Sequence, residues 1–244
     1  TKTQKSIDGI SASVVVITKE DIEKISATTL KDVLDKVPSI NSQFGRFPHA
    51  SALSKGAISI RGVGANGTLI LLDGKRLSGE TESPYEMSRI PASIIERIEI
   101  VKGSMSTLYG SDAIGGVINI ITKKASETQS TLVNTGFGKE EKYFGEARYG
   151  GKIDDDTYYR IYAKRADRDA SVKTDGTDGE NSWYTERTGF RVDKDNKDGN
   201  SLTVQGDVFY SSENLYLTLP ATLLEATNPA VTYDYLRREG GNIL

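Results

Sequence analysis

The chain has 244 residues, a formal net charge of −3, one histidine and no cysteine. The lack of cysteine excludes disulfides and thiolate metal sites, and the single histidine, His49, excludes a histidine-rich metal cluster. A slightly acidic composition also argues against a general nucleic-acid-binding protein, which would carry a basic stripe.

The apolar runs are short. The longest are Val14–Ile17 and Leu69–Leu72, far below the ~20 residues of a membrane-spanning helix. No secretory signal peptide is recognisable at Thr1. These features predict a soluble protein, with the exception of membrane β-barrels, whose strands show weak alternation instead of long apolar runs.

Up to Lys124, short strands and helices alternate. Thr18 with Asp21, and Thr29 with Asp32, have the spacing of helix capping boxes. The second predicted helix places Leu30, Val33, Leu34 and Val37 on one apolar face and stops at Pro38. Strands are expected at Ser13–Ile17, Ala57–Arg61, Thr68–Leu72, Glu96–Val101 and Val117–Thr122, a tight turn at Asp73–Gly74, and short helices from Pro91 to near Ile95 and at Ser104–Tyr109.

After Lys124 the pattern is that of β-strands alone. In the segment Thr157–Asp167, Tyr159, Ile161 and Ala163 alternate with charged and tyrosine residues. In a soluble sandwich the apolar face forms the core; in a membrane barrel it faces lipid and the charged face lines a wet lumen. Alternation alone does not separate the two. The five predicted strands are Ser130–Gly138, Tyr143–Tyr149, Thr157–Asp167, Tyr184–Asp193 and Ser201–Tyr210.

The connections between these segments differ in length. Lys139–Lys142, Gly150–Asp156 and Lys194–Asn200 are short, while Arg168–Trp183 and the stretch from Ser211 onward are long. Outer-membrane barrels have short turns on one side and longer loops on the other. A plugged barrel has ~22 strands of ~9–11 residues, about 200 residues in all. We therefore expect about five strands of a truncated barrel, with Gly240–Leu244 as the opening of a sixth.

Three enzyme or metal motifs are weak. Gly62, Gly64 and Gly67 have dinucleotide-fingerprint spacing, but a strand is predicted to follow them instead of a helix. Asp193 and Asp195 suggest a Ca²⁺ loop, but its spacing is wrong and the glutamate at the twelfth position is missing, so a hairpin turn is favoured. Ser104 and Ser106 do not complete a nucleophile motif.

Two glycine-punctuated blocks are far more specific. The first joins Ile58–Gly62 to Thr68–Arg76, and the second joins Ile95–Gly103 to Leu108–Lys124. Together they resemble the plug of the TonB-dependent outer-membrane receptors, most closely the ferric-catecholate siderophore and colicin receptor branch. The resemblance runs from about Ser6 to Lys124 and is looser beyond it. Lys102–Gly103–Ser104 replaces the usual Arg-Gly-Pro, and no TonB box is recognisable.

The resemblance implies an α+β plug domain over residues 1–124, with a small mixed sheet and short helices, followed over residues 125–244 by antiparallel strands of an incomplete transmembrane β-barrel. It implies a non-enzymatic receptor in the Gram-negative outer membrane, with its plug in the lumen facing the periplasm. The plug would gate TonB-dependent uptake of a ferric siderophore, with no intrinsic cofactor or metal site. TonB, outer-membrane lipid and colicins are the implied partners, and nucleic acid is not. A haem or cobalamin receptor of the same family, a soluble ligand-binding β module and a nucleotide-dependent enzyme are the alternatives.

The resemblance also nominates residues. Charged side chains set in apolar sequence would hold the plug in the barrel, and cationic and aromatic side chains on the loops Gln43–Gly56 and Ser78–Ser88 would face an anionic, aromatic ligand. Solvated strand faces and ordinary mobile loops are the structural alternatives. The predicted plug–barrel contacts are Arg61, Glu96, Arg97, Glu99 and Lys102, and the predicted ligand contacts are Arg46, Phe47, His49, Lys55 and Tyr85.

Overall fold

The computed structural model describes residues 13–43, 57–63, 67–76, 90–139, 141–170, 172, 176–179, 182–195, 200–218 and 231–243. All five predicted ligand contacts, Arg46, Phe47, His49, Lys55 and Tyr85, lie outside the described residues. The chain divides into two compact units, residues 1–123 and residues 124–244. The boundary lies beside Lys124, where the composition of the sequence changes.

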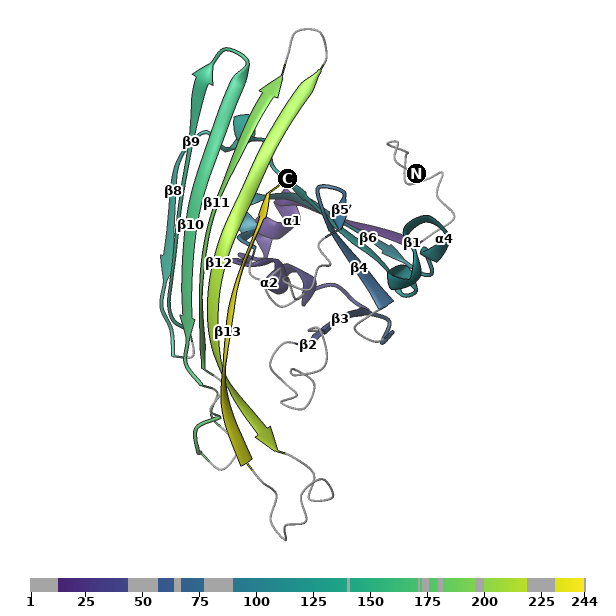
Figure 1. Ribbon diagram of the computed structural model, residues 1–244, viewed down its shortest axis with the longest axis vertical. Coiled ribbons are helices and arrows are strands. Elements are labelled where there is room, and N and C mark those ends of the chain that lie inside the picture. The colour runs from purple at the N-terminus through teal and green to yellow at the C-terminus, as the bar shows by residue number, and fades with distance from the viewer. Residues whose placement is uncertain are drawn as a thin grey trace. The chain divides into compact units, whose positions relative to one another are not determined.

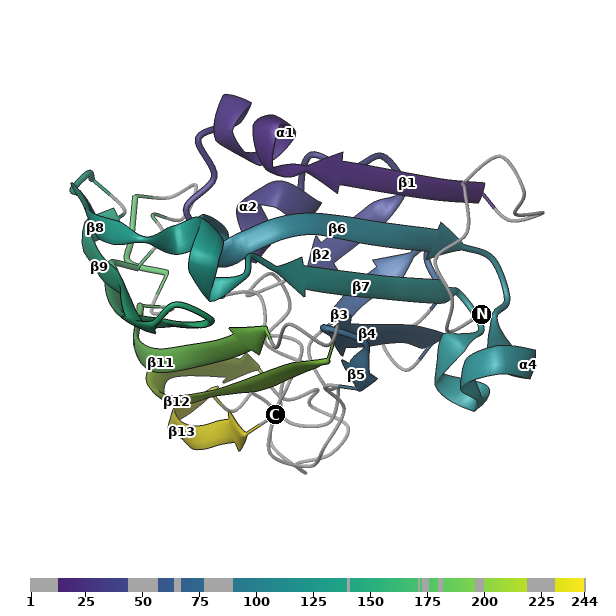
Figure 2. The ribbon, with the colours of Figure 1, turned by 90° about the horizontal axis from the view of Figure 1, so that it is seen from above.

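The first unit is built on a mixed five-stranded sheet with the order β1-β6-β7-β4-β5. Only the β4–β7 pair is parallel, and Figure 2 shows β1, β6 and β7 side by side. A separate antiparallel pair is formed by β2 and β3. The strands are β1 (Ser13–Thr18), β2 (Ile40–Gln43), β3 (Ala57–Ile60), β4 (Thr68–Leu72), β5 (Lys75–Arg76), β6 (Ile95–Lys102) and β7 (Gly116–Thr122). The helices are α1 (Lys19–Lys24), α2 (Leu30–Leu34), η3 (Ala92–Ile94), α4 (Ser106–Tyr109) and η4 (Ser111–Ala113).

Both predicted capping boxes are present. The Thr18 hydroxyl accepts from the Asp21 amide at 3.4 Å, and the Asp21 carboxylate accepts from the Thr18 amide at 3.2 Å. Thr29 and Asp32 repeat the exchange at 3.4 and 2.8 Å. Each box satisfies amide groups that the first helical turn leaves without partners. This is why helices as short as α1 and α2 begin at these residues.

Asp32 also forms hydrogen bonds outside its capping box. Its carboxylate also accepts from the amide and hydroxyl of Thr28, both at 3.0 Å. Burial raises the pKa of this carboxyl, but the hydrogen bonds from Thr29 and Thr28 act the other way and outweigh it, so the pKa lies below its ordinary value. The ionised form of Asp32 therefore stabilises the folded first unit.

The core of the first unit follows strand alternation. Ile98 and Ile100 on β6 are buried, while Arg97 and Glu99, on either side of Ile98 in the sequence, are half-buried. The apolar face predicted for the second helix is buried as well. A second cluster joins Leu69, Leu71, Ala113 and Val117, with Val101 and Met105 against it. The sheet therefore buries apolar side chains on both faces and leaves one polar stretch, around Arg97 and Glu99, half-exposed.

The second unit is one antiparallel sheet of six strands, which run in sequence order from β8 to β13 (Figure 1). The two ends of this order are not paired with each other, so the sheet is open. It begins after a short 3₁₀ turn, η5 (Ala125–Thr128). The strands are β8 (Ser130–Gly136), β9 (Glu141–Asp154), β10 (Thr157–Arg168), β11 (Trp183–Asp195), β12 (Ser201–Thr218) and β13 (Val231–Ile243). Together the two units confirm the predicted fold class of a mixed-sheet plug followed by antiparallel strands.

Two predictions about the second unit are wrong in detail. The sixth strand, β13, begins at Val231 and ends at Ile243, so Gly240 lies near its end and not at its opening. The described residues thus contain six strands in this sheet, where five and the opening of a sixth were predicted. The strand was missed because Arg237, Arg238 and Glu239 interrupt its apolar pattern. The predicted turn Gly150–Asp156 is also too long, because β9 extends to Asp154 and only two residues separate it from β10.

The predicted pattern of connection lengths is only partly present. The connection between β8 and β9 is short, as predicted, but Ser211–Thr218, predicted as part of a long connection, belongs to β12. In an antiparallel sheet, successive connections lie at alternate ends. β10 and β12 therefore end, and β11 and β13 begin, at the end of the sheet with the two long connections, while β9 and β11 end, and β10 and β12 begin, at the opposite end. In the described part of the chain, no helix has the length and apolarity needed to cross a membrane.

Candidate functional site

The polar face of the six-stranded sheet is buried. Arg160 is 2 % exposed and Lys164 4 %, and Arg187, Arg191 and Gln205 on the neighbouring strands are buried as well. Strand register aligns these positions in transverse rows, with Lys164 opposite both Glu146 on β9 and Arg187 on β11. The face therefore concentrates charge where a water-soluble sheet would place its apolar core.

Opposite charges on this face are matched across or along strands. Lys164 Nζ lies 4.0 Å from Glu146 Oε2, and each side chain is 2 % exposed. Arg187 Nη1 lies 2.6 Å from Asp207 Oδ2, with the guanidinium also 5.1 Å from the centre of the Phe209 ring. Buried charges of this kind are tolerated only when they are paired. The pairs explain how so many ionisable groups occupy one buried face.

The opposite face of the same strands carries exposed apolar side chains. Ile161 is 51 % exposed and lies between the buried Arg160 and Tyr162. The exposed set covers β8 to β12 and consists of Val133, Tyr143, Tyr149, Ile153, Ile161, Phe190, Leu202, Val204 and Val208. A continuous apolar surface of this extent is unusual for a protein in water. The sheet thus has inverted polarity, apolar outside and charged inside.

The apolar face ends in a polar cluster near the long connections. The Arg165 guanidinium lies 5.8 Å from the Tyr143 ring centre and 5.7 Å from that of Tyr184. It also donates to the Tyr143 hydroxyl at 2.8 Å and pairs with Glu186. Amphipathic groups of this type are enriched where an apolar medium meets water.

The predicted plug–barrel residues have partners inside the first unit. Lys19 Nζ lies 3.8 Å from Glu96 Oε1, and Arg97 Nε donates to Glu99 Oε1 at 2.8 Å. Lys102 Nζ donates to the Pro38 carbonyl at 3.3 Å. The Arg61 side chain is exposed, and its backbone amide donates to the Ser39 carbonyl at 2.8 Å. The structure brings Arg97 and Glu99 together and does not join them to the other three, and their contact with a barrel stays a prediction.

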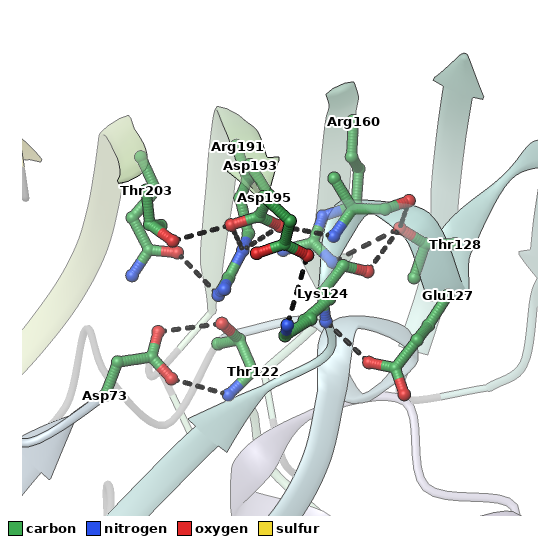
Figure 3. A network of polar contacts seen from close by, with 12 residues as sticks. Asp73, Thr122, Lys124, Glu127, Thr128, Arg160, Arg191, Asp193, Asp195 and Thr203 are labelled. Atoms are coloured by element: carbon green, nitrogen blue, oxygen red, sulfur yellow. Dashed lines mark hydrogen bonds and ion pairs between the residues drawn. The ribbon is translucent and has the colours of Figure 1, made fainter. Parts of the chain in front are cut away.

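Sequence reasoning missed two polar residues that link the strands of the first unit. Asn119 on β7 donates to Glu99 Oε2 at 3.2 Å and accepts from the Gly74 amide at 3.2 Å. Asp73 accepts from the amide and hydroxyl of Thr122 at 2.8 and 2.7 Å (Figure 3). The predicted Asp73–Gly74 turn was the available signal, because an aspartate in a positive-φ turn can direct its carboxylate to a neighbouring strand.

The structure describes the surroundings of Gly62 and Asp193, which belong to two of the alternative motifs. Gly62 is followed by the strand β4 and not by a helix, so no helix N-terminus is offered to a pyrophosphate. Asp193 is buried and accepts from Arg191, Thr203 and the Ala125 amide. Its oxygens are therefore committed to protein donors. Among the described residues, no cluster of three or more His, Cys, Asp or Glu side chains could hold a metal ion.

A compact mixed-sheet domain joined to an antiparallel sheet of inverted polarity defines the class of a plugged outer-membrane receptor. Residues 6–117 match the family model of the TonB-dependent Receptor Plug Domain. These residues of the chain therefore form a TonB-dependent receptor plug domain, and the family of that domain consists of transporters and receptors. The predicted resemblance is confirmed.

Relatives and solved structures fall into two branches of that family. The vitamin B12 transporter BtuB of Vibrio vulnificus is 37 % identical over 150 residues, which cover 61 % of this chain and 24 % of that protein. The siderophore receptor PirA of Acinetobacter baumannii has a TM-score of 0.58 and 29 % identity, covering 82 % of this chain and 31 % of that one. A ferric enterobactin receptor of Pseudomonas aeruginosa, in complex with enterobactin, has a TM-score of 0.55 and 26 % identity, covering 82 % and 33 %. The chain spans about a quarter of the length of the curated relatives that it matches.

Proposed function

We propose that this chain supplies the plug domain, residues 1–124, and the first barrel strands, residues 125–244, of a Gram-negative outer-membrane receptor. The observation that carries the proposal is the inverted polarity of the six-stranded sheet. Ile161, Phe190 and Val204 would face lipid, and Arg160, Lys164 and Arg187 would face the lumen. A soluble sandwich would have to bury the same charges in a dry core, at a high desolvation cost.

The height of the apolar surface fits a membrane. Along β10, Arg165 ends the apolar stretch near the long connections, and Thr157 lies at the short turn. They are eight positions apart, which at ~3.3 Å per residue spans about 26 Å. A tilt of ~40° reduces this to about 20 Å along the membrane normal, close to the ~25 Å apolar band of outer-membrane barrels. The Arg165 cluster would then lie at the edge of the band.

We infer that the cargo is a ferric siderophore, specifically a ferric catecholate. The siderophore receptor and the ferric enterobactin receptor named above support this choice, since both exceed 25 % identity to the chain. The predicted ligand contacts Arg46, Phe47, His49, Lys55 and Tyr85 would provide positive charge and aromatic surface to an anionic aromatic chelate. The iron would arrive already chelated, so the receptor need not supply metal ligands.

Vitamin B12 is the second candidate cargo. It is favoured by one observation, the 37 % identity to a vitamin B12 transporter. That identity covers 150 residues and 24 % of the transporter. Haem remains a third possibility within the same family.

Arg61, Glu96, Arg97, Glu99 and Lys102 are proposed to hold the plug within the barrel. Pairs of this type in a wet but enclosed lumen would contribute roughly 1–3 kcal/mol each. They would also have to break when the plug moves. TonB would supply the energy from the periplasmic side, and colicins are proposed as further ligands of the outer face.

The deciding experiment is uptake by cells that lack their own receptors and express the whole gene encoding this chain. We expect radiolabelled iron presented as a ferric catecholate to accumulate, and accumulation to stop when TonB is deleted. Labelled vitamin B12 and haem are offered in parallel. Uptake of vitamin B12 without uptake of iron would replace the first cargo with the second, and uptake of none by a correctly inserted protein would refute the proposed function.

The ligand contacts are tested by binding. Replacing Arg46 or Lys55 with alanine should raise the Kd for a ferric catecholate by roughly 2- to 30-fold, as expected for loss of one cation–aromatic interaction of about 0.5–2 kcal/mol. Lys75→Ala, which removes an exposed lysine from β5, is the matched control and should leave the Kd unchanged. Equal effects at all three positions would argue against a specific site.

A further inference from the structure

The second unit begins with a junction segment, residues 124–129, that is bonded to its own sheet. The Ala125 amide donates to Asp193 Oδ2 on β11 at 2.6 Å (Figure 3). The Lys124 amide donates to Glu127 Oε2 at 2.7 Å, which closes the 3₁₀ turn from its start. Ala125 and Thr128 are buried.

Asp193 is held in position by two strands. Arg191 Nε donates to its two carboxylate oxygens at 3.0 and 2.8 Å, and the Thr203 hydroxyl on β12 donates at 2.7 Å. The Asp193 side chain is 5 % exposed. A carboxylate fixed by these donors and directed at a backbone amide forms a charge-assisted hydrogen bond, which is among the stronger contacts that a turn can have.

The strands on the other side of the turn approach it closely. A Cβ atom on Gly150, in β9, would lie 2.0 Å from the Thr128 carbonyl oxygen. Only glycine permits this approach of two backbones. On β10, Arg160 Nη1 donates to the Thr128 hydroxyl at 3.4 Å. Three adjacent strands therefore contact one short turn.

The residues just before the junction segment are held by a different and more exposed group. Thr122 is bonded to Asp73, an exposed residue of the β4–β5 turn in the first unit. Only Lys123 lies between Thr122 and the junction segment. The two hydrogen bonds from Thr122 are part-buried, whereas the one from Ala125 to Asp193 is buried, and hydrogen bonds closer to water open at lower free energy.

We propose that the junction segment is the fixed end of the chain on the second unit: it unfolds with β9–β11 and not with the first unit, so that displacement or unfolding of the first unit stops at Lys124. The inference goes beyond the proposed function, because it locates where a rearrangement of the plug would end. It does not depend on the identity of the cargo, and its test requires no transport.

Native-state hydrogen exchange on the intact receptor in detergent tests the proposal, with urea raised until the amides of β6 and β7 exchange. We expect the amides of residues 124–129 to remain protected at that point and to exchange together with β10 and β11. Exchange of the junction segment together with β6 and β7 would overturn the proposal. A single common transition of both units would overturn it equally.

Two pairs of variants isolate the contacts. Gly150→Ala should force η5 off the sheet, while Gly145→Ala, on the same strand, places its methyl group where no atom lies within 4 Å. Asp193→Ala removes the buried acceptor, while Asp195→Asn removes an exposed pair with Lys124 at 3.4 Å.

Gly150→Ala and Asp193→Ala should each accelerate exchange of the junction amides by about 10- to 100-fold, as expected for loss of a hydrogen bond to a charged group. The two controls should change it by less than about threefold. Protection of β10 and β11 verifies that the sheet itself has folded in each variant. Unchanged junction exchange in both Gly150→Ala and Asp193→Ala, with the sheet folded, refutes the proposal.

Discussion

The buried pair formed by Lys164 and Glu146 gives the sharpest test of how the sheet tolerates its inner charges. The two residues are directly opposite each other on β10 and β9, 4.0 Å apart and each 2 % exposed. At that distance and an effective dielectric constant of ~20, their attraction is about 4 kcal/mol. Glu146→Gln removes this attraction and leaves the lysine buried beside a neutral amide. We therefore expect the variant to lose about 3–5 kcal/mol of stability.

A double-mutant cycle separates the pair from its surroundings. Replacing Lys164 with methionine in the Glu146→Gln background removes the uncompensated charge, so most of the lost stability should return. The exposed pair Lys142–Asp169 is the matched control. Its atoms are closer, at 3.2 Å, but its side chains are about half exposed, and Asp169→Asn should cost no more than about 1 kcal/mol.

The assay is unfolding of the intact receptor in detergent, followed by loss of the heat-resistant folded band on gels and by urea titration. The reasoning is refuted if the single and double variants at positions 146 and 164 are equally unstable. It is also refuted if Asp169→Asn costs as much as Glu146→Gln, because burial would then have no influence on the strength of a pair.

Three predictions concern the first unit and are measured by urea unfolding. Ile118→Ala removes a fully buried side chain and should cost about 2–5 kcal/mol, whereas Ile114→Ala, at a 56 % exposed position, should cost less than about 0.5 kcal/mol; equal losses would contradict the described core. Asp32 has a folded-state pKa below its ordinary value of 3.8, so its contribution is complete above that value and disappears as the pH falls through the folded pKa; Asp32→Asn should reduce the slope of stability against pH in this acidic range, and an unchanged slope would show that another group controls it. Asp73→Ala should cost about 1–2 kcal/mol through the two hydrogen bonds from Thr122, and Asp73→Asn less, because asparagine tolerates the positive φ of the turn and retains one acceptor; a larger loss in Asp73→Asn than in Asp73→Ala would argue against this role.

Local signals in the first unit predicted the structure well because each one acts within a few residues. The capping pairs Thr18–Asp21 and Thr29–Asp32 specify where short helices begin, and both are present in the structure. The Asp73–Gly74 turn has positive φ at both residues, which closes the hairpin between β4 and β5. Such features need no information from distant parts of the chain.

Long-range contacts could not be obtained in the same way. Asn119 and Gly74 are bonded across 45 positions of sequence, and Asp193 and Ala125 across 68. Nothing in their local sequence distinguishes these polar residues from solvated ones. Strand order decides which of them meet, and alternation does not determine strand order. The contacts that Asn119 makes in the first unit and Asp193 makes in the second were therefore found only in the structure.

The strand β13 was also not predicted in full from the sequence, because of its charged residues. Its sequence carries Arg237, Arg238 and Glu239 in succession. In a soluble protein such a run is typical of a solvated loop. In a sheet with one polar and one apolar face, a run of charged residues need not end a strand. The sequence pattern that indicates a strand therefore differs between a sheet with a polar exterior and a sheet with an apolar exterior.

The sequence predicts the two faces of the sheet, and the structure shows which of them is buried. Alternation in Thr157–Asp167 established two faces of opposite polarity but left open which of them is buried. Strand pairing settles this, because Glu146, Lys164, Arg187 and Asp207 can satisfy one another only if β9–β12 align them on the same side. Because these charges and their partners lie on one face, strand alternation places Ile161 and its neighbours on the opposite, exposed face. The apolar exterior is thus a consequence of the pairing of charges inside, and a change that breaks a pair should weaken the sheet even though it touches none of the exposed apolar residues.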